Sequence, residues 1–176
     1  MPEGEPAPLY LPHRRIYTVG HSNQSLETFL AMLDKHDITH LVDIRSIPYS
    51  SGFPWFQRDA LARTVRDLGI DYRYLGDKLG GRPENKMMYF PDGTPDYVRI
   101  RQLPFYRAGI NELFSLMGGP FQVCLMCAEE DPDHCHRKVM LGPSLRGARI
   151  EVVHLRSDQP VPSDKEVHEG EAGPHH

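Results

Sequence analysis

At 176 residues, with 39% hydrophobic and 25% charged residues, the chain has the size and composition of one ordinary globular domain. Its formal net charge of −4 lacks the overall basic excess of a dedicated nucleic-acid-binding protein, although a local basic patch is still allowed. It has no apolar run near the ~20 residues of a membrane span and no signal-peptide pattern at its start, so we expect a cytoplasmic protein without membrane association.

The two ends of the chain differ from its middle in composition. Residues 1–13 are rich in proline and poor in apolar residues, which is typical of a flexible arm. Residues 157–176 are acidic, rich in proline and glycine, and without periodicity, which predicts a disordered tail. A single folded domain is therefore expected over residues 14–156.

Within this domain, strand-like and helix-like segments alternate. Strands are predicted at 15–20, 39–45, 70–75, from 121 onward and at 149–155, and helices at 26–33, 61–68 and 105–117, with a helical turn at 97–101. Ser25 is placed as an N-cap and Gly69 as a helix stop. Residues 76–95 form a long irregular segment, which favours a functional loop or lid. The alternation predicts an α/β fold with a mostly parallel sheet and helices on both faces.

The stretch from Phe121 to Met140 concentrates reactive side chains. Its first half is a short apolar run expected to be a strand buried on both faces, and its end begins a helical pattern. All three cysteines lie in it, within twelve positions, so no disulfide framework can hold this fold together. In a parallel sheet, ligands bind at the edge formed by the carboxyl ends of the strands, and this stretch ends there.

Cys135 is the leading candidate for a nucleophile. If it sits at the start of a helix, the helix dipole and the neighbouring Arg137 favour its thiolate form, and His136 could carry a proton. The alternative is a small buried cysteine without chemistry, because cysteine is among the most buried residue types. Cys127 ends the strand and should point toward the same edge. Cys124 should face the opposite side, because side chains alternate along a strand.

The cysteine and histidine spacing also suggests metal ligands. The pattern C-x2-C followed by C-H has suitable ligand types, but a zinc knuckle needs a turn between its first two cysteines and the apolar run there is a poor turn. A transition-metal site combining His21 with Cys127, Cys135 or His136 stays open as an alternative. No residue is assigned as a metal ligand.

Other strand ends carry further polar side chains. His21 and Ser22 follow the first strand, where His21 could act as a general acid or base, contact an anion, or only bond a loop carbonyl. Asp43 and Arg45 end the second strand and could orient a substrate or form a structural ion pair. Arg82, in the long segment, could bind phosphate or carboxylate. The aromatic cluster at 53–56 could stack bases, but packing in the core or in a homodimer is favoured.

Five motifs in order carry a family resemblance. They are T-V-G-H-S at 18–22, V-D-I-R-S-I-P at 42–48, L-G-G-R at 79–82, F-Y-R-A-G-I at 105–110 and C-A-E-E-D-P-D-H-C-H-R at 127–137. Together they resemble the bacterial family known as domain of unknown function 488, from about Ile16 to Leu155. The resemblance implies an α/β fold and an enzyme of unsettled activity, without a substrate. Gly142-Pro143 departs from the family pattern and predicts a short or kinked last helix.

The leading hypothesis is an intracellular enzyme of the thiol- or histidine-dependent transferase or hydrolase type. Its predicted catalytic residues are Cys135, His21, Cys127, His136 and Glu129, and its predicted substrate-binding residues are Ser22, Asp43, Arg45, Arg82 and Arg137. The arginines favour an anionic substrate, which could be a phosphorylated metabolite, a nucleotide or a nucleic acid. The alternative is a metal-binding or nucleic-acid-binding module without catalysis.

Overall fold

The fold is described from a computed structural model, which describes residues 14–49, 52–129 and 135–157. The predicted arm at 1–13 and residues 158–176 of the predicted tail lie outside these ranges. Residues 130–134, which precede Cys135 in the sequence, also lie outside them. Within the described part of the chain, no helix has the length and apolar character needed to cross a membrane.

Five parallel strands form the centre of the molecule. They are β1 (Arg15–Gly20), β2 (His40–Asp43), β3 (Asp71–Tyr74), β4 (Val123–Cys127) and β5 (Glu151–Leu155), in the sheet order β3-β2-β4-β1-β5. All five residues of β4 are buried, because this strand lies in the middle of the sheet with helices on both sides. A continuous apolar run is what such a strand requires.

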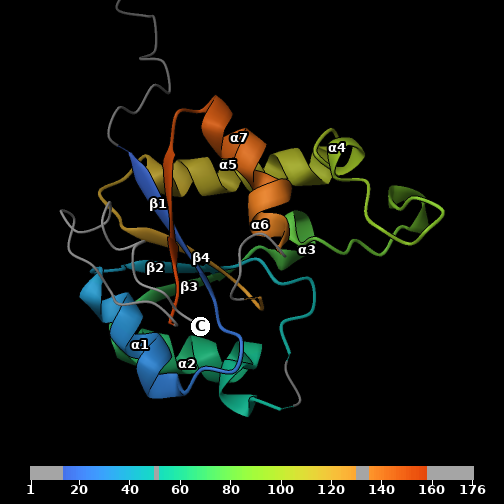
Figure 1. The fold of residues 1–176 in the computed structure, drawn as a ribbon. Coiled ribbons are helices and arrows are strands. Elements are labelled where there is room, and N and C mark those ends of the chain that lie inside the picture. The colour runs from blue at the N-terminus through green and yellow to red at the C-terminus, as the bar shows by residue number, and fades with distance from the viewer. Residues whose placement is uncertain (1–13, 50–51, 130–134, 158–176) are drawn as a thin grey trace, which may run out of the picture.

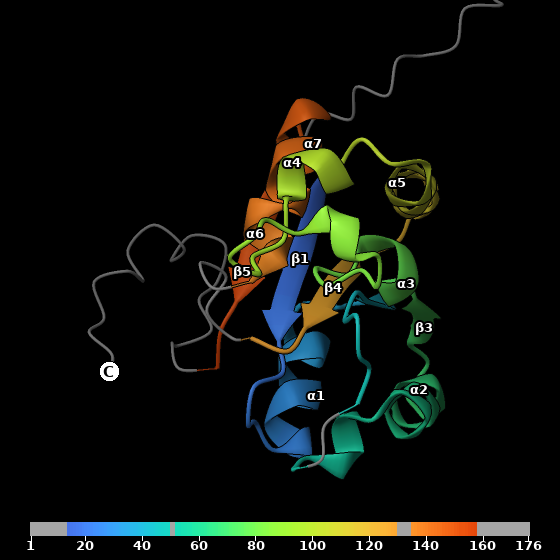
Figure 2. The same cartoon turned by 90° about the vertical axis from the view of Figure 1, so that its right-hand side faces the viewer.

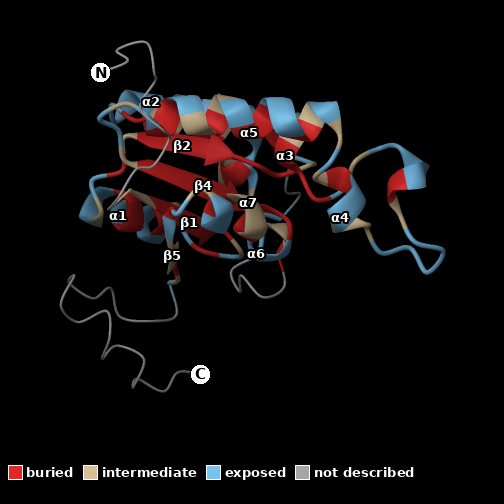
Figure 3. Ribbon diagram, turned by 90° about the horizontal axis from the view of Figure 1, so that it is seen from above, coloured by how far each residue is buried: buried red, intermediate tan, exposed pale blue. Residues whose placement is uncertain are grey.

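Helices cover both faces of the sheet (Figures 1 and 2). They are α1 (Leu26–Lys35), α2 (Arg58–Asp67), α3 (Gly76–Leu79), α4 (Tyr97–Ile100), α5 (Pro104–Met117), α6 (His136–Val139) and α7 (Leu141–Gly147), with short 3-10 turns η1 (Pro54–Phe56) and η2 (Lys86–Met88). The apolar residues of α1 and α2 pack on one face of the sheet, and those of α3, α5 and α7 pack on the other. Figure 3 shows that the central strands of the sheet are buried. The predicted α/β fold is confirmed.

Local sequence signals explain several element boundaries. The Ser25 hydroxyl accepts a hydrogen bond from the Thr28 backbone N–H at 3.1 Å, as an N-cap should. Gly69 follows α2 with φ +85°, a left-handed conformation that favours glycine. Two expectations were wrong in detail: the helix predicted at 61–68 lies at 58–67, and Leu68 after it is 60% exposed. The segment at 76–95 is also less irregular than expected, because it contains α3 and η2.

The last helix is short and interrupted, as the sequence predicted. Pro143 has no backbone N–H, so the Val139 carbonyl loses its helical donor, and α6 ends at that residue before α7 begins. The Arg101 guanidinium instead donates to the Val139 carbonyl oxygen at 3.4 Å. His136 therefore begins a separate four-residue helix, and Cys135 lies immediately before it.

The topology places a switch point at the carboxyl end of β4. The chain leaves β1 and β2 toward the face of α1 and α2, whereas it leaves β4 toward the face of α6 and α7 (Figure 2). Because β4 lies between β2 and β1, neighbouring connections diverge there. Such switch points are where open α/β sheets bind ligands.

Candidate active site

The predicted site residues fall into two groups, one on each face of the sheet at its carboxyl edge. Side chains alternate along β4, so Cys127 packs with the apolar residues of α5 and α7, and Cys124 packs with those of α1 and α2. The predicted opposite orientation of these two cysteines is confirmed. Cys135 joins the same apolar cluster as Cys127. None of the three cysteines, all of which the structure describes, forms a disulfide.

The group on the α1 and α2 face is centred on a buried ion pair. Arg45 donates from Nε to Asp43 Oδ1 at 2.9 Å and from Nη2 to Asp43 Oδ2 at 2.8 Å. The exposed fractions are 0% for Asp43 and 4% for Arg45. Tyr72, which sequence reasoning missed, donates its hydroxyl to Asp43 Oδ2. Only the strand register reveals it, because Tyr72 pairs with the residue two positions before Asp43.

Burial and charge set the protonation of this group. Burial alone would lower the pKa of Arg45, but hydrogen bonds and charge from Asp43 raise it above its ordinary value. Burial, followed by the Asp43 charge, raises the pKa of Tyr72, so the phenol keeps its proton and donates. The arrangement is a satisfied ion pair with one additional donor. These contacts fit a structural ion pair better than a substrate-orienting role for Asp43 and Arg45, because the guanidinium is almost completely enclosed.

His21 completes this group as a neutral hydrogen-bonding residue. Its Nδ1 lies 2.9 Å from the Ser22 carbonyl oxygen, which can only accept, so Nδ1 carries the proton. Nε2 then accepts from Arg45 Nη1 at 3.4 Å. The ring stacks on Phe56 with centroids 4.5 Å apart. Burial lowers the pKa of His21 to about 4, so the imidazole is uncharged near neutral pH.

Acidification is expected to destabilise the fold through His21. The unfolded chain binds this proton with a pKa of 6.5 and the folded protein with a pKa of about 4, so the free energy of unfolding falls as the pH falls through this window. The loss attributable to this group is at most about 3 kcal/mol. Urea unfolding at pH 7 and pH 4.5 measures it, and His21→Gln should flatten the difference. An equal pH dependence in the variant contradicts the expectation.

The group on the other face is a paired thiol and imidazole. Cys135 Sγ lies 3.6 Å from Nδ1 of His136. Nε2 of His136 lies 3.1 Å from the Ile44 carbonyl oxygen, which can only accept, so Nε2 carries the proton. In the neutral ring, the lone pair of Nδ1 therefore faces the sulfur. This geometry allows the thiol to give its proton to the imidazole, which is how a cysteine nucleophile is activated.

The turn that follows α3 packs directly against this pair. A Cβ atom at Gly81 would lie 2.7 Å from Cβ and Cγ of His136, so only glycine fits beside the ring. The next residue, Arg82, is exposed, and its backbone N–H donates to the Ser46 hydroxyl at 2.8 Å. Two of these groups affect the pKa of Tyr97 in α4. Burial raises this pKa, the charge of Arg82 opposes the rise, and Cys135 adds to it. Tyr97 therefore lies within electrostatic range of both Arg82 and the Cys135 thiol.

The other predicted residues lie near the carboxyl edge of the sheet. Ser22 has φ 46°, unusual for a residue other than glycine, and its backbone N–H donates to the Ala128 carbonyl at 2.8 Å. Glu129 is exposed, and its carbonyl oxygen accepts from Cys127 Sγ at 3.4 Å. The side chain of Arg137 lies outside the described residues. These positions stay predictions.

The structure bears on two alternatives raised by the sequence, a metal site and base stacking by the aromatic cluster. Among the described residues, no three side chains of the His, Cys, Asp and Glu types converge as metal ligands. The aromatic cluster at 53–56 packs inward: Phe56 is 0% exposed, and Trp55 donates from Nε1 to the Gln24 carbonyl at 3.2 Å. These contacts favour packing over base stacking for these rings.

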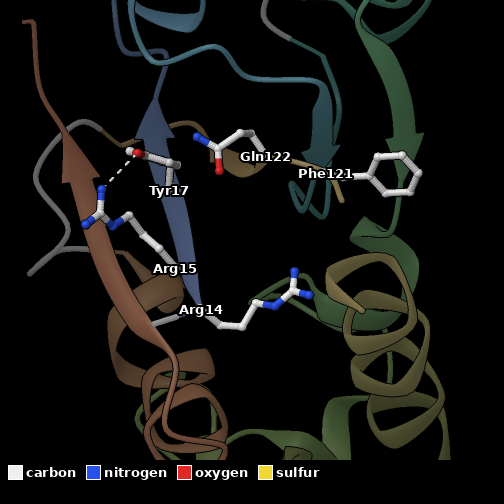
Figure 4. Close-up of a pocket in the computed structure, with 5 residues that line it drawn as sticks. All are labelled: Arg14, Arg15, Tyr17, Phe121 and Gln122. Atoms are coloured by element: carbon white, nitrogen blue, oxygen red, sulfur yellow. Dashed lines mark hydrogen bonds between the residues drawn. The ribbon is translucent and has the colours of Figure 1, made fainter. Parts of the chain in front are cut away.

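A pocket of about 310 Å³ lies at the amino ends of β1 and β4, away from both groups (Figure 4). It is lined by Arg14, Arg15, Tyr17, Phe121 and Gln122. Its arginines are occupied: Arg14 donates to the Gly119 carbonyl beyond the end of α5 at 2.9 Å, and Arg15 pairs with Glu151 at 3.2 Å. A cation at a helix C-terminus and a surface ion pair explain both side chains.

The fold and the paired side chains define a parallel α/β protein with a candidate thiol site at the carboxyl edge of its sheet. A family model described as "Domain of unknown function DUF488" matches residues 25–142, two thirds of the 176-residue chain. The chain belongs to this family, which confirms the resemblance. The motif at 18–22 lies outside the match, and the other four lie within it. No curated protein and no solved structure matches the chain.

Proposed function

We propose that the protein is a thiol-dependent transferase or hydrolase with Cys135 as nucleophile and His136 as its base. The observation that carries the proposal is the 3.6 Å contact between Cys135 Sγ and the ring nitrogen of His136 that is left without a proton. Tautomer and ring orientation are both fixed by the Ile44 carbonyl. A reactive cysteine needs this arrangement of base and orienting group.

The chemistry follows from the pair. The Cys135 thiol gives its proton to Nδ1 of His136, and the thiolate sulfur forms a bond to an electrophilic centre of the substrate. The leaving group departs with its bonding electrons and takes the proton from Nδ1. Water or a second substrate then breaks the sulfur–substrate bond, with His136 accepting the proton of that nucleophile. His21 is not used, because its unprotonated nitrogen accepts from Arg45.

An anionic substrate suits the surroundings of the pair. Arg82 is exposed, and its side chain makes no hydrogen bond or ion pair with any described residue. Its position is fixed at the backbone by Ser46 and by Gly81, which packs against His136. A guanidinium held in this way can bind a phosphate or carboxylate beside the thiol. A small anionic metabolite is therefore the proposed substrate class.

The test is the pH titration of thiolate absorbance at 240 nm in the purified protein. A signal that appears below pH 8 and disappears in Cys135→Ser is expected, and His136→Gln should move it to higher pH, because the imidazolium no longer stabilises the thiolate. Cys124→Ser serves as the matched control, since Cys124 lies on the opposite face of the sheet. An unchanged titration in Cys135→Ser or His136→Gln contradicts the proposal.

A further inference from the structure

The two groups of side chains on opposite faces of the sheet are joined by one peptide group. The Ile44 carbonyl accepts from His136 Nε2 at 3.1 Å, and the N–H of the same peptide unit, contributed by Arg45, donates to Asp43 Oδ1 at 3.1 Å. In a trans peptide the C=O and the N–H point in opposite directions. One end therefore meets the imidazole and the other end meets the buried carboxylate.

We infer that Asp43 is a positioning residue for the Cys135–His136 pair and acts on it through the Ile44–Arg45 peptide group. The inference rests on the proposed function of that pair. The carboxylate fixes the rotation of the peptide plane and so the direction of the Ile44 carbonyl. It also polarises the amide, which makes the carbonyl a stronger acceptor for the imidazole N–H. In a Ser-His-Asp triad, the carboxylate binds the catalytic histidine directly. Here the Asp43 carboxylate acts on His136 through an intervening peptide group.

The burial of Asp43 supports this role. A buried ion pair is weak evidence for stability, because desolvation of the two charges can exceed their attraction. Here, Asp43 Oδ1 accepts from both the backbone N–H and Nε of Arg45, so one oxygen holds the side chain and the peptide together. Tyr72 and Arg45 Nη2 hold the other oxygen. The carboxylate therefore has one rigid position from which to hold the peptide.

The rest of the segment is fixed in the same way. The Ile44 N–H donates to the Met126 carbonyl of β4 at 2.9 Å, and the Tyr74 hydroxyl donates to the Arg45 carbonyl at 2.8 Å. Every backbone polar group of these two residues therefore has a partner within the described part of the chain. Because all of these backbone groups are hydrogen-bonded, the peptide plane keeps the orientation that the carboxylate sets.

Other charged and titratable groups lie on the elements next to the pair. Among the described residues these include Arg82 and Tyr97 on the α3–α4 side, Glu129 after β4, and Arg101 and Lys138 around α6. A variant that leaves all of them unchanged isolates the effect of the Asp43–Arg45 ion pair.

The test compares the 240 nm thiolate titration of the full chain with that of the double variant Asp43→Asn, Arg45→Gln. Removing both charges avoids an unpaired buried ion, and the neutral amide oxygen that replaces the carboxylate holds the backbone N–H less strongly. We expect the titration midpoint to rise by about one pH unit, so the thiolate fraction near neutral pH falls. Nitrogen NMR of labelled histidine should show His136 as the Nε2–H tautomer in the native protein and as a mixture in the variant.

Leu61→Ala is the matched control. Leu61 is fully buried in the cluster on the same face as the ion pair, so the variant is destabilised without touching the hydrogen-bonded path. Its titration should match that of the native protein. An unchanged midpoint in the double variant, or an equal shift in Leu61→Ala, overturns the inference.

Tyr72→Phe decides the question if the double variant does not fold. The change removes one donor from the Asp43 carboxylate, which then binds the Arg45 N–H more strongly, and the thiolate midpoint should fall rather than rise. A midpoint that stays or rises overturns the inference. The proposed function and the positioning role fail on different results. If His136→Gln leaves the thiolate titration unchanged, the Cys135–His136 pair is wrong. If His136→Gln shifts the titration but the Asp43 double variant leaves it unchanged, only the positioning role is wrong.

Discussion

Replacing Arg45 by alanine is expected to lower the free energy of unfolding by about 3–5 kcal/mol, because it leaves the Asp43 carboxylate buried without its counter-ion. Asp43 is 0% exposed, so water cannot take the place of the guanidinium without opening the structure. Only the Tyr72 hydroxyl and the backbone N–H of residue 45 then donate to the carboxylate, and the His21 acceptor also loses its donor. Against the total of about 5–15 kcal/mol typical of a domain, the loss is a large share. Urea unfolding followed by circular dichroism at pH 7 measures it.

Arg73→Ala provides the matched control. Arg73 pairs with Asp71 at 3.2 Å in the same region of the sheet, but the two side chains are 43% and 39% exposed. Water screens this pair, so its removal should cost no more than about 1 kcal/mol. Equal losses in the two variants would show that burial does not distinguish the pairs, and the description of the Asp43–Arg45 contact as a buried ion pair would then be wrong.

Gly76→Ala is expected to be the second severe substitution. A Cβ atom at this position would lie 1.8 Å from the Arg45 carbonyl oxygen and 2.5 Å from the Tyr74 hydroxyl. The backbone cannot yield without breaking the hydrogen bond from Tyr74 to Arg45. Overpacking in a core typically costs about 1–3 kcal/mol, and a clash with backbone should cost about 3 kcal/mol or more. Thermal unfolding of the variant measures the loss.

Gly147→Ala is the corresponding control. Gly147 ends α7, and a Cβ atom there would meet nothing within 4 Å. Alanine has the higher helix propensity, so this variant should be as stable as the native protein or slightly more stable. If Gly76→Ala unfolds at the temperature of this control, the close approach of α3 to the end of β2 is incorrect.

The sequence predicted the layers of this fold because its periodicities are strong. The run V-C-L-M-C can only suit a strand that is buried on both faces, and it became the centre of the sheet. The N-cap at Ser25 and the helix break at Pro143 follow from single residues whose hydrogen-bonding chemistry leaves little choice. Strand ends were less accurate: the second strand was expected over 39–45, and β2 covers only His40–Asp43.

The arrangement within the site was harder to predict. The sequence placed His21, Arg45, Cys127 and Cys135 along one edge but could not say that the sheet divides them, since that depends on the register of strands far apart in the chain. Alternation along one strand revealed the separation of Cys124 from Cys127. The contact of His136 with the Ile44 carbonyl involves backbone, which leaves no signal in residue types. The same is true of the peptide that joins the two groups.

The partner that orients His136 lies 92 positions earlier in the chain. A nascent polypeptide that has completed β2, β3 and even β4 still lacks an imidazole at the Ile44 carbonyl, and an unassembled Cys135 has no base at a fixed position. Contacts between such distant positions form late, because the intervening chain must first be ordered. If Cys135 is the nucleophile we propose, its reactivity should therefore emerge only with the finished tertiary structure, and the chain would carry no activated thiol during synthesis.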